Sequence, residues 1–412
     1  MPIRRDERDT LRALAQQVAE IAALPVQRET IARWKALNGL RPVRPMVMID
    51  QICWHEMDVD GELALRTGDR FCRDIETSLR RTLYAWKHMR ADMVVEPAID
   101  VPKAIRHSGF GIEAQEQRAV SDPRNDVVGH FYFDQLKTDA DLARIRTPEI
   151  TLDAAATART EEQAHAIFDG VLPVRMRGMG YPMLGPWDQI STWRGVENVL
   201  YDVADRPEFL HRIMARLIEA QLGALDQIEA LGLLEHCPRV HCTGAYTDEL
   251  PAAGSDPAHL RTRDVWTFGQ AQMFSTVSPA THQEFELDYA VRWYRRFGLV
   301  YYGCCEPLDG KIEIIRGIPH VRKISMSPWV DVEKGAAQIR RDFVFSRKPS
   351  PAFLARDAWD PAGVARDLRA TRDACARHGC PLEFILKDIS TVHYQPQRLW
   401  EWTRIAQQVA EE

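Results

Sequence analysis

The sequence predicts an α/β protein built as a closed (β/α)8 TIM barrel with an N-terminal helical extension. Three observations lead to this fold. Short apolar runs rich in β-branched and aromatic residues alternate with segments of helical spacing, most clearly in the C-terminal half. The joints between them are short, which requires parallel strands connected by helices. The strand candidates number eight, and eight parallel strands close a barrel of this kind.

The chain begins with a charged segment and the amphipathic run LRALAQQVAEIAAL, which predicts helices in residues 1–40. We expect these helices to pack outside the main fold or against a second subunit of a homodimer. The barrel is assigned to residues 41–412. Its expected strands, in chain order, are residues 46–52, 93–96, 172–176, 239–242, 299–302, 321–326, 343–346 and 382–386.

Helices are expected at residues 311–316, 332–339, 361–376 and 399–409, between and after the last four strands. Residues 127–133 also have strand character, and we assign them to an excursion from the barrel. A doubly wound open sheet is the alternative fold. It receives no support, because no GxGxxG or GxxxxGK[ST] phosphate loop follows a strand.

Charge and hydropathy argue against several classes of function. Lys and Arg total 53 and Asp and Glu 59, and a net charge of -6 argues against a nucleic-acid backbone as the partner. No apolar stretch approaches the roughly 18 to 20 residues of a membrane span. The N-terminus lacks the apolar block of a secretion signal. We therefore expect a cytoplasmic protein with reduced thiols, in which a special cysteine is a ligand or a nucleophile.

In such a barrel the chemistry lies at the carboxyl ends of the strands, so the residues after each strand are the candidates. The most unusual string is Tyr302-Gly303-Cys304-Cys305-Glu306, in which two thiols and a carboxylate follow the fifth strand. Thiolates and carboxylates are zinc ligands, so Cys304, Cys305 and Glu306 are predicted to bind a metal. The structural alternative is that the cysteines are small residues that fill a tight turn.

His241 and His393 lie at other strand ends and are candidates to complete this metal site. A histidine beside Cys242 is equally typical of a buried structural pair. Lys387-Asp388 ends an apolar strand, where buried charge costs free energy unless it is paired or used. The two residues are therefore candidate catalytic groups, or else bridges to neighbouring strands.

The remaining candidates also follow strands or precede a helix. Asp50, Glu96 and Tyr302 are assigned to catalysis. Arg347, followed by Lys348, suits a carboxylate or phosphate of a substrate, unless the two cations belong to a solvated loop. Trp266 and Phe268 are predicted to line a substrate pocket. The cysteines expected to be structural are Cys53, Cys72, Cys237, Cys375 and Cys380.

The chain from about residue 271 resembles the uroporphyrinogen decarboxylase superfamily, which includes methyltransferases that work with corrinoid proteins. The resemblance lies in the order of the segments AQMFSTVSP, YYGCCEPLDGKIEIIRGIPHVRKISMSPW and VFSRKPSP, followed by the last strand and the terminal helix. It implies a barrel with its active site at the strand carboxyl ends. The arginine-rich segment of the decarboxylase branch is replaced here by MIDQIC, residues 48–53, which argues against that branch.

In the methyltransferase branch, the resemblance implies a zinc site made by His-x-Cys at a strand end and a cysteine after the last strand. This chain has Tyr302-Gly303-Cys304 at the first place and Lys387-Asp388 near the second. The departure implies an altered zinc site, formed by Cys304 with Cys305 or Glu306 and Asp388 or His393, or a site without metal.

Three hypotheses of function follow. The first is methyl transfer between a small methylated substrate and a separate corrinoid protein, because the chain has no corrinoid-binding motif of its own. The second is a metal-free decarboxylase or lyase in which Asp50 or Glu96 protonates a carbanion and Arg347 holds a carboxylate. The third is a binding subunit of a larger assembly, without catalysis.

Overall fold

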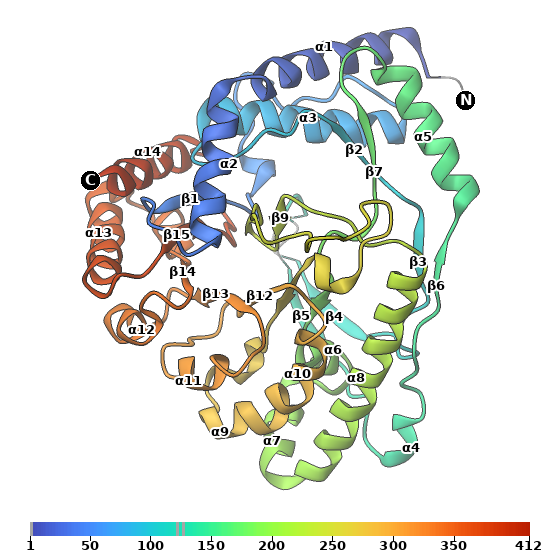
Figure 1. Ribbon diagram of the computed structural model, residues 1–412, viewed down its shortest axis with the longest axis vertical. Helices are drawn as coiled ribbons and strands as arrows, with labels where there is room; N and C mark the ends of the chain where they lie inside the picture. Colours follow the sequence, from blue (N-terminus) through green and yellow to red (C-terminus); the bar gives the residue numbers. More distant parts are fainter. Residues whose placement is uncertain (1–2, 121–122, 126–127) are drawn as a thin grey trace.

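A parallel sheet of seven strands, in the order β1-β15-β14-β13-β12-β11-β8, forms the centre of the molecule, and helices surround it (Figure 1). The computed structural model describes residues 3–120, 123–125 and 128–412. The α/β class predicted from the sequence is confirmed. The strands of this sheet are β1 (Met46–Ile49), β8 (Met183–Leu184), β11 (Trp266–Gly269), β12 (Leu299–Tyr302), β13 (Val321–Met326), β14 (Val344–Arg347) and β15 (Leu382–Leu386).

The C-terminal half follows the predicted alternation closely. Strands β12 to β15 and their helices lie within a few residues of the predicted bounds. Helix α13 begins where the Asp360 side chain accepts a hydrogen bond from Gly363 N, and it ends at Gly379 with φ +72°. The helices of this half are α11 (Ile312–Ile315), α12 (Val332–Ile339), α13 (Pro361–His378) and α14 (Gln397–Glu411).

Two strand predictions differ from the structure, and one strand of the large sheet was not predicted. Residues 93–96 are not a strand, and β2 (Ile99–Pro102) begins after them. It pairs with β7 (Val174–Arg177) in a separate two-stranded sheet, and among the described strands no ladder joins β2 to β1. Residues 239–242 do not form a parallel strand but start an antiparallel hairpin, β9 (Arg239–Val240) and β10 (Thr243–Gly244). The sequence analysis missed β11, because its WTFG segment is too short to show a clear alternation between apolar and polar residues.

The excursion predicted around residues 127–133 is present within the described chain. There β5 (Gly129–Tyr132) pairs with β4 (Glu116–Ala119), and residue 127 lies outside the described residues. Another antiparallel pair joins β3 (Ile105–His107) to β6 (Ile150–Leu152). The other helices are α3 (Arg70–His88), α4 (Asp139–Leu142), α5 (Ala154–Phe168), α6 (Pro186–Arg194), α7 (Val196–Asp205), α8 (Pro207–Ala230), α9 (Pro279–His282) and α10 (Asp288–Tyr294). Short helical turns lie at Trp54–Glu56, Thr262–Asp264, Gln272–Ser275, Gln283–Leu287 and Pro351–Phe353.

The first 40 residues pack against the rest of the chain. Helix α1 (Arg5–Ala22) lies along α3 (Figure 1), contacts the end of α5 at Ile167, and buries an apolar stripe that includes Leu11, Leu14 and Val18. Helix α2 (Pro25–Asn38) turns toward β1. Its Asn38 side chain donates hydrogen bonds to the carbonyl oxygens of Gly244 and Tyr246, at 3.0 and 2.7 Å. The helical extension therefore contributes to the hydrophobic cores of this chain.

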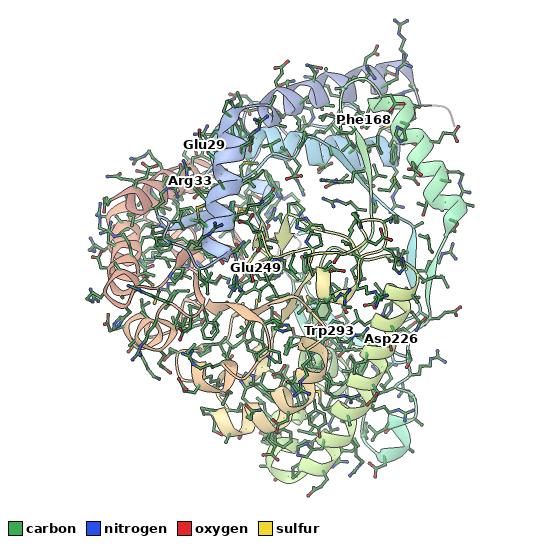
Figure 2. All side chains as sticks on the ribbon, in the orientation of Figure 1. Glu29, Arg33, Phe168, Asp226, Glu249 and Trp293 are labelled. Carbon is green, nitrogen blue, oxygen red and sulfur yellow. The ribbon has the colours of Figure 1, made fainter. Side chains whose placement is uncertain are left out.

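Side chains of the large sheet alternate between two separate cores. Val47, Ile324 and Phe345 point into the larger core under the surrounding helices. Met48 and Tyr301 point into a second core, together with Trp34 and Cys242 from α2 and the β9–β10 hairpin. Side chains fill the space between the helices and the sheet (Figure 2). In the described part of the chain, no helix has the length and apolar character to span a membrane.

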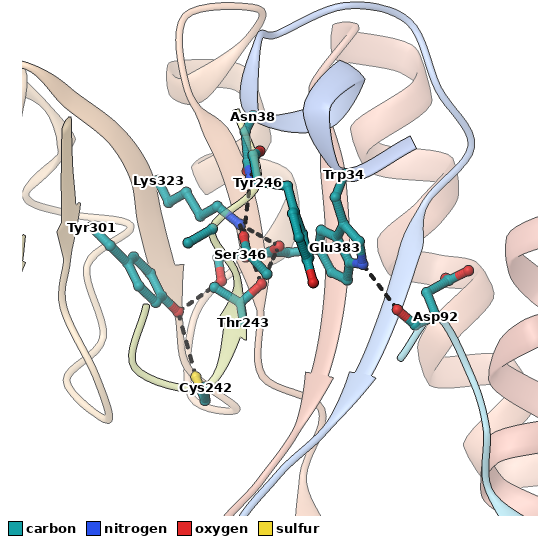
Figure 3. A network of polar contacts seen from close by, with 12 residues as sticks. Trp34, Asn38, Asp92, Cys242, Thr243, Tyr246, Tyr301, Lys323, Ser346 and Glu383 are labelled. Carbon is teal, nitrogen blue, oxygen red and sulfur yellow. Dashed lines mark hydrogen bonds and ion pairs between the residues drawn. The ribbon is translucent and has the colours of Figure 1, made fainter. Parts of the chain in front are cut away.

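The second core contains a buried ion pair (Figure 3). Lys323 Nζ lies 2.8 Å from Glu383 Oε2, and both side chains are fully buried. The ammonium group also donates to Thr243 Oγ1 at 3.2 Å and to the carbonyl oxygen of Gly244 at 3.1 Å. All three of its protons are thereby used, which offsets the desolvation of the charge. The ion pair ties the β9–β10 hairpin to the strands of the sheet.

Candidate sulfur-containing active site

Polar side chains gather where several parallel strands end. Cys304 follows β12 and Lys387 follows β15, and the Lys387 ammonium nitrogen lies 3.1 Å from the Cys304 sulfur. Two strands separate β12 from β15 in the sheet. In a flat sheet the two strands would be roughly 14 Å apart. The contact therefore requires the sheet to curl between these two strands.

We call Cys304, Cys305, His241, Lys387 and Asp388 the sulfur site. The Cys304 sulfur lies 3.6 Å from the Cys305 sulfur and 3.8 Å from His241 Nε2. The Cys305 sulfur lies 3.6 Å from Asp388 Oδ2, and the same oxygen is 3.1 Å from Lys387 Nζ. The structure thus brings together five of the residues predicted from the sequence, which come from three separate parts of the chain.

The turn that carries the two cysteines is fixed by hydrogen bonds. Cys304 N donates to Glu306 Oε2 at 2.9 Å, and Ser325 Oγ donates to the carbonyl oxygen of Cys304 at 2.7 Å. The other Glu306 oxygen accepts from Ala271 N at 3.1 Å. The carboxylate of Glu306 is fully buried and occupied by backbone amides. Glu306 shapes the turn, whereas the sequence analysis predicted a metal ligand.

Several residues at this edge have left-handed backbone conformations. The φ angles are +57° at Asp388, +48° at His241 and +48° at Gln51, and Gly303 has φ +92°. Such conformations cost about 1 to 3 kcal/mol for a residue other than glycine and concentrate at functional sites. At Gly303 a Cβ atom would lie 2.4 Å from Leu308 Cδ1, so only glycine fits before the two cysteines.

The two thiols differ in their pKa. The hydrogen bond from Cys304 and the Lys387 ammonium group lower the pKa of Cys305, and they outweigh burial and the charges of Asp388 and Glu306, which act to raise it. The same hydrogen bond, together with burial, raises the pKa of Cys304. Burial works to lower the pKa of Lys387, but the negative charges that Cys304 and Cys242 carry when ionised, together with the Asp388 carboxylate, outweigh it and raise this pKa. Lys387 therefore remains an ammonium ion.

His241 is a neutral imidazole at neutral pH. Burial, with further contributions from Lys387 and Lys348, lowers its pKa to about 3. The ring stacks on Phe268 with ring centroids 4.0 Å apart. Phe268, predicted to line a substrate pocket, is fully buried and supports this histidine. Trp266 Nε1 donates to the carbonyl oxygen of Ala245 at 3.0 Å, so Trp266 also holds the hairpin segment.

The donor types at the sulfur site include those that zinc prefers, but their arrangement does not fit a zinc site. Among the residues that the structure describes, no three His, Cys, Asp or Glu side chains are grouped so as to hold a metal ion. The Lys387 ammonium group occupies the position next to the Cys304 sulfur. His393, a predicted ligand, is exposed and bonds through Nε2 to the carbonyl oxygen of Ala355 at 2.7 Å.

Tyr302 and Arg347 point away from the sulfur site, because neighbouring residues in a strand face opposite sides. The Tyr302 hydroxyl lies 2.7 Å from His282 Nε2 on the helix side of the sheet. Arg347 is buried on that side as well and donates to the carbonyl oxygen of Ser327. Their neighbours, Tyr301 and Lys348, occupy the opposite face, where the Lys348 ammonium group donates to the Tyr301 hydroxyl.

Asp50 and Glu96 border cavities beside β1. Asp50 Oδ1 pairs with Arg239 Nη2 at 3.0 Å, and both residues line a cavity of about 610 Å³. Glu96 lines a second cavity of about 470 Å³, where it accepts a 2.6 Å hydrogen bond from the Tyr246 hydroxyl. Both carboxylates are thus paired, and no residue of the sulfur site lines either of these two cavities.

The sequence analysis missed Asp188, in the first turn of α6. Burial and the charge of Glu306 raise the pKa of Asp188 to about 6. Its carboxylate accepts hydrogen bonds from the side-chain amides of Gln270 and Gln272. No local pattern marks this residue, because it follows a strand of only two residues, β8. The Lys323–Glu383 pair was also missed, although charges within the apolar runs VRKISM and LEFIL were a usable signal.

Comparisons with known proteins found matches among solved structures. No protein-family model matches the chain, and no curated protein matches it. Among solved structures, a methyltransferase from Methanosarcina mazei is 13% identical in sequence and has a TM-score of 0.49. The match covers 93% of this chain and 98% of that chain.

Proposed function

We propose that the protein is a methyltransferase that removes a methyl group from a small methylated substrate and passes it to a corrinoid carried by a separate protein. The contact between Lys387 Nζ and the Cys304 sulfur, next to the Cys305 sulfur, carries the proposal. A fixed cation favours the thiolate form of a neighbouring cysteine, and a thiolate is a strong nucleophile. A methyl carbon is a suitable electrophile for it.

In the proposed step the Cys305 sulfur attacks the methyl carbon. A carbon–sulfur bond forms, and the bond between the methyl carbon and its heteroatom breaks. The heteroatom leaves with the electron pair and takes a proton from solvent. Cys304 donates its S–H hydrogen bond to the Cys305 sulfur before the attack, and Lys387 supplies a positive charge 3.1 Å from the Cys304 sulfur. The product is an S-methylated Cys305.

A reduced corrinoid on the partner protein would supply the nucleophile that takes the methyl group from the enzyme. This chain contributes access to the methylated sulfur. Cys305 is half-buried and the Asp388 side chain beside it is 49% exposed, whereas Cys304 is almost fully covered. The outer of the two sulfurs is therefore the one that a second protein reaches.

The proposal includes the eight-stranded barrel expected from the sequence. Asp92 N donates to the carbonyl oxygen of Val47 at 3.0 Å, so the segment before β2 starts alongside β1. Strand β7, the partner of β2, continues into β8 at the other end of the seven-stranded sheet. These two observations support a closed ring of eight strands. In this ring β2 lies next to β1, and β7 with its continuation β8 lies between β2 and β11. The sulfur site then lies at the carboxyl mouth of that ring.

The test measures methylation of the protein itself. The purified chain is incubated under reducing conditions with methanol, methylamines, a methyl thioether and methoxylated aromatic acids, and its mass is recorded. Trypsin releases residues 297–311 as one peptide that contains Cys304 and Cys305 as its only cysteines. We expect one methyl group on this peptide with at least one compound. Free cob(I)alamin, added afterwards as the acceptor, should remove it.

Three variants locate the reaction. Cys305→Ser should abolish both methylation and transfer to cobalamin, and Cys304→Ser should slow them. Cys380→Ser is the matched control, because the Cys380 sulfur donates to the carbonyl oxygen of Ala336, on helix α12. It should behave like the unmodified chain. Undiminished transfer by Cys305→Ser, or no methylated protein with any compound of the set, would overturn the proposal.

A further inference from the structure

We infer that Cys304 and Cys305 form a reversible disulfide with each other and that this bond switches off the sulfur site under oxidising conditions. The two residues are adjacent in the sequence, and their sulfur atoms lie 3.6 Å apart. Formation of the disulfide is a property of this pair alone. Its effect on catalysis rests on the proposed function, in which the Cys305 thiolate is the nucleophile.

The backbone of the turn holds the two sulfurs on the same side. Glu306 accepts a hydrogen bond from Cys304 N, and Ser325 donates one to the carbonyl oxygen of Cys304. Both groups are buried, so these hydrogen bonds are protected from water. Gly303 gives the turn a conformation that a side chain would obstruct. The pair is thus preorganised before any oxidant arrives.

The two cysteines differ in access, and this sets the order of the reaction. Cys305 is half-buried, whereas Cys304 is 4% exposed. Hydrogen peroxide therefore meets Cys305 first. The Cys305 sulfur bonds to one peroxide oxygen, the O–O bond breaks, and water leaves after proton uptake. The Cys304 sulfur then attacks the Cys305 sulfenic acid and releases a second water. In total, two thiols and one peroxide give one disulfide and two waters.

A disulfide between adjacent cysteines is strained, which makes it reversible. Neighbouring Cα atoms are about 3.8 Å apart across a trans peptide bond. Unstrained disulfides join Cα atoms about 4.4 to 6.8 Å apart. Strained disulfides have more oxidising potentials and are readily reduced by thiols. The bond between Cys304 and Cys305 therefore suits a switch better than a permanent crosslink.

The surrounding charges tolerate the oxidised state. Oxidation removes the thiolate that neutralises the Lys387 ammonium group. Asp388 Oδ2 lies 3.1 Å from the same nitrogen, so the buried cation keeps a counter-ion. The disulfide leaves no thiolate at the site, and the nucleophile of the proposed methyl transfer is lost.

The experiment follows the tryptic peptide 297–311 after treatment of the folded, full-length chain with hydrogen peroxide. Remaining thiols are blocked with iodoacetamide before digestion. We expect this peptide to lose two hydrogen atoms, to escape alkylation, and to regain two alkylatable thiols after dithiothreitol. Reduced and oxidised protein are then compared for methylation by the active compound, and we expect a loss of at least about tenfold that dithiothreitol restores.

Variants test the order of the two steps. Cys304→Ser should trap Cys305 as a sulfenic acid that dimedone labels, and Cys305→Ser should leave Cys304 largely unreacted. Cys380→Ser should form the disulfide normally. Two free thiols after peroxide, oxidation to sulfinic acid without a disulfide, or labelling of Cys304 in preference to Cys305 would overturn the inference. Because the disulfide is read from the peptide mass, it is established or rejected independently of methyl transfer.

Discussion

At the scale of single residues, the sulfur site depends on one buried ammonium group. Lys387 is 4% exposed and contacts a sulfur and a carboxylate, each at 3.1 Å. A buried lysine without such partners would lose its proton, because desolvation disfavours the charge. Here the partners reverse this effect and raise the pKa of Lys387. The same positive charge lowers the pKa of Cys305, so the two groups support each other.

Replacing Lys387 should make the cysteine pair less reactive. In Lys387→Met the thiolate loses its cation, so the pKa of Cys305 should rise. The rate of iodoacetamide labelling of peptide 297–311 at pH 7 should then fall by roughly tenfold. Lys387→Arg should retain most of the rate. Lys334→Met, an exposed lysine paired with Asp309, is the control. Equal rates in all variants would show that Lys387 does not stabilise the thiolate.

Asp188 gives the folded protein a specific dependence on pH. Its pKa is about 6 in the folded chain, compared with an ordinary value of 3.8. The folded state therefore keeps a proton that the unfolded state has released, and the resulting stabilisation is present at low pH and lost as pH rises through 6. The Asp188→Asn variant lacks this loss. Between pH 5 and pH 7.5 its free energy of unfolding, measured with urea, should gain about 1 to 2 kcal/mol relative to the parent chain. A difference that does not change with pH would contradict this assignment.

At the scale of elements, the β9–β10 hairpin matters most, because it carries His241 to the sulfur site. The hairpin is held by Lys323 and Glu383 from two strands and by Asn38 from α2 (Figure 3). These contacts are buried and far apart in the sequence. A two-residue pairing of strands cannot fix a hairpin in one orientation by itself. The surrounding elements therefore determine where His241 lies.

The buried ion pair should show strong coupling between its partners. Lys323→Met leaves the carboxylate of Glu383 buried without a cation, and we expect a loss of about 3 to 5 kcal/mol in the free energy of unfolding. Glu383→Leu should cost a similar amount. The double variant should lose much less stability than the sum of the losses of the two single variants, because no uncompensated buried charge remains. Urea unfolding of all four chains tests this, and additive losses would contradict it.

At the scale of the whole molecule, the chain is held together on one side by its N-terminal helix. Strand β2 is not joined to β1 by a described ladder, and the 470 Å³ cavity lies between them. Helix α1 packs over this region against α3 and α5. The apolar stripe of α1 thus closes a third core that the large sheet does not cover.

Removal of residues 1–22 should destabilise the molecule as a whole. The deletion exposes apolar side chains of α3 and α5, including Leu79 and Phe168, which are buried in the intact chain. We expect a loss of several kcal/mol in the free energy of unfolding, or aggregation of the product. The control is Gln16→Ala, on the exposed face of α1, which should change stability by less than about 0.5 kcal/mol. A shortened chain with full stability would show that α1 is dispensable.

The sequence by itself determined the alternation of strands and helices in the C-terminal half and the cysteine pair after β12. These features are local, since apolar spacing and turn residues lie within a few positions of each other. It also indicated Lys387, Asp388 and His241, although not that they meet around the sulfur atoms of Cys304 and Cys305. Only the tertiary structure decided which residue of each adjacent pair faces the site. Tyr301 and Lys348 face it, and Tyr302 and Arg347 do not. The reason is that a shift of one residue reverses every side chain of a strand, and packing between distant segments selects the direction.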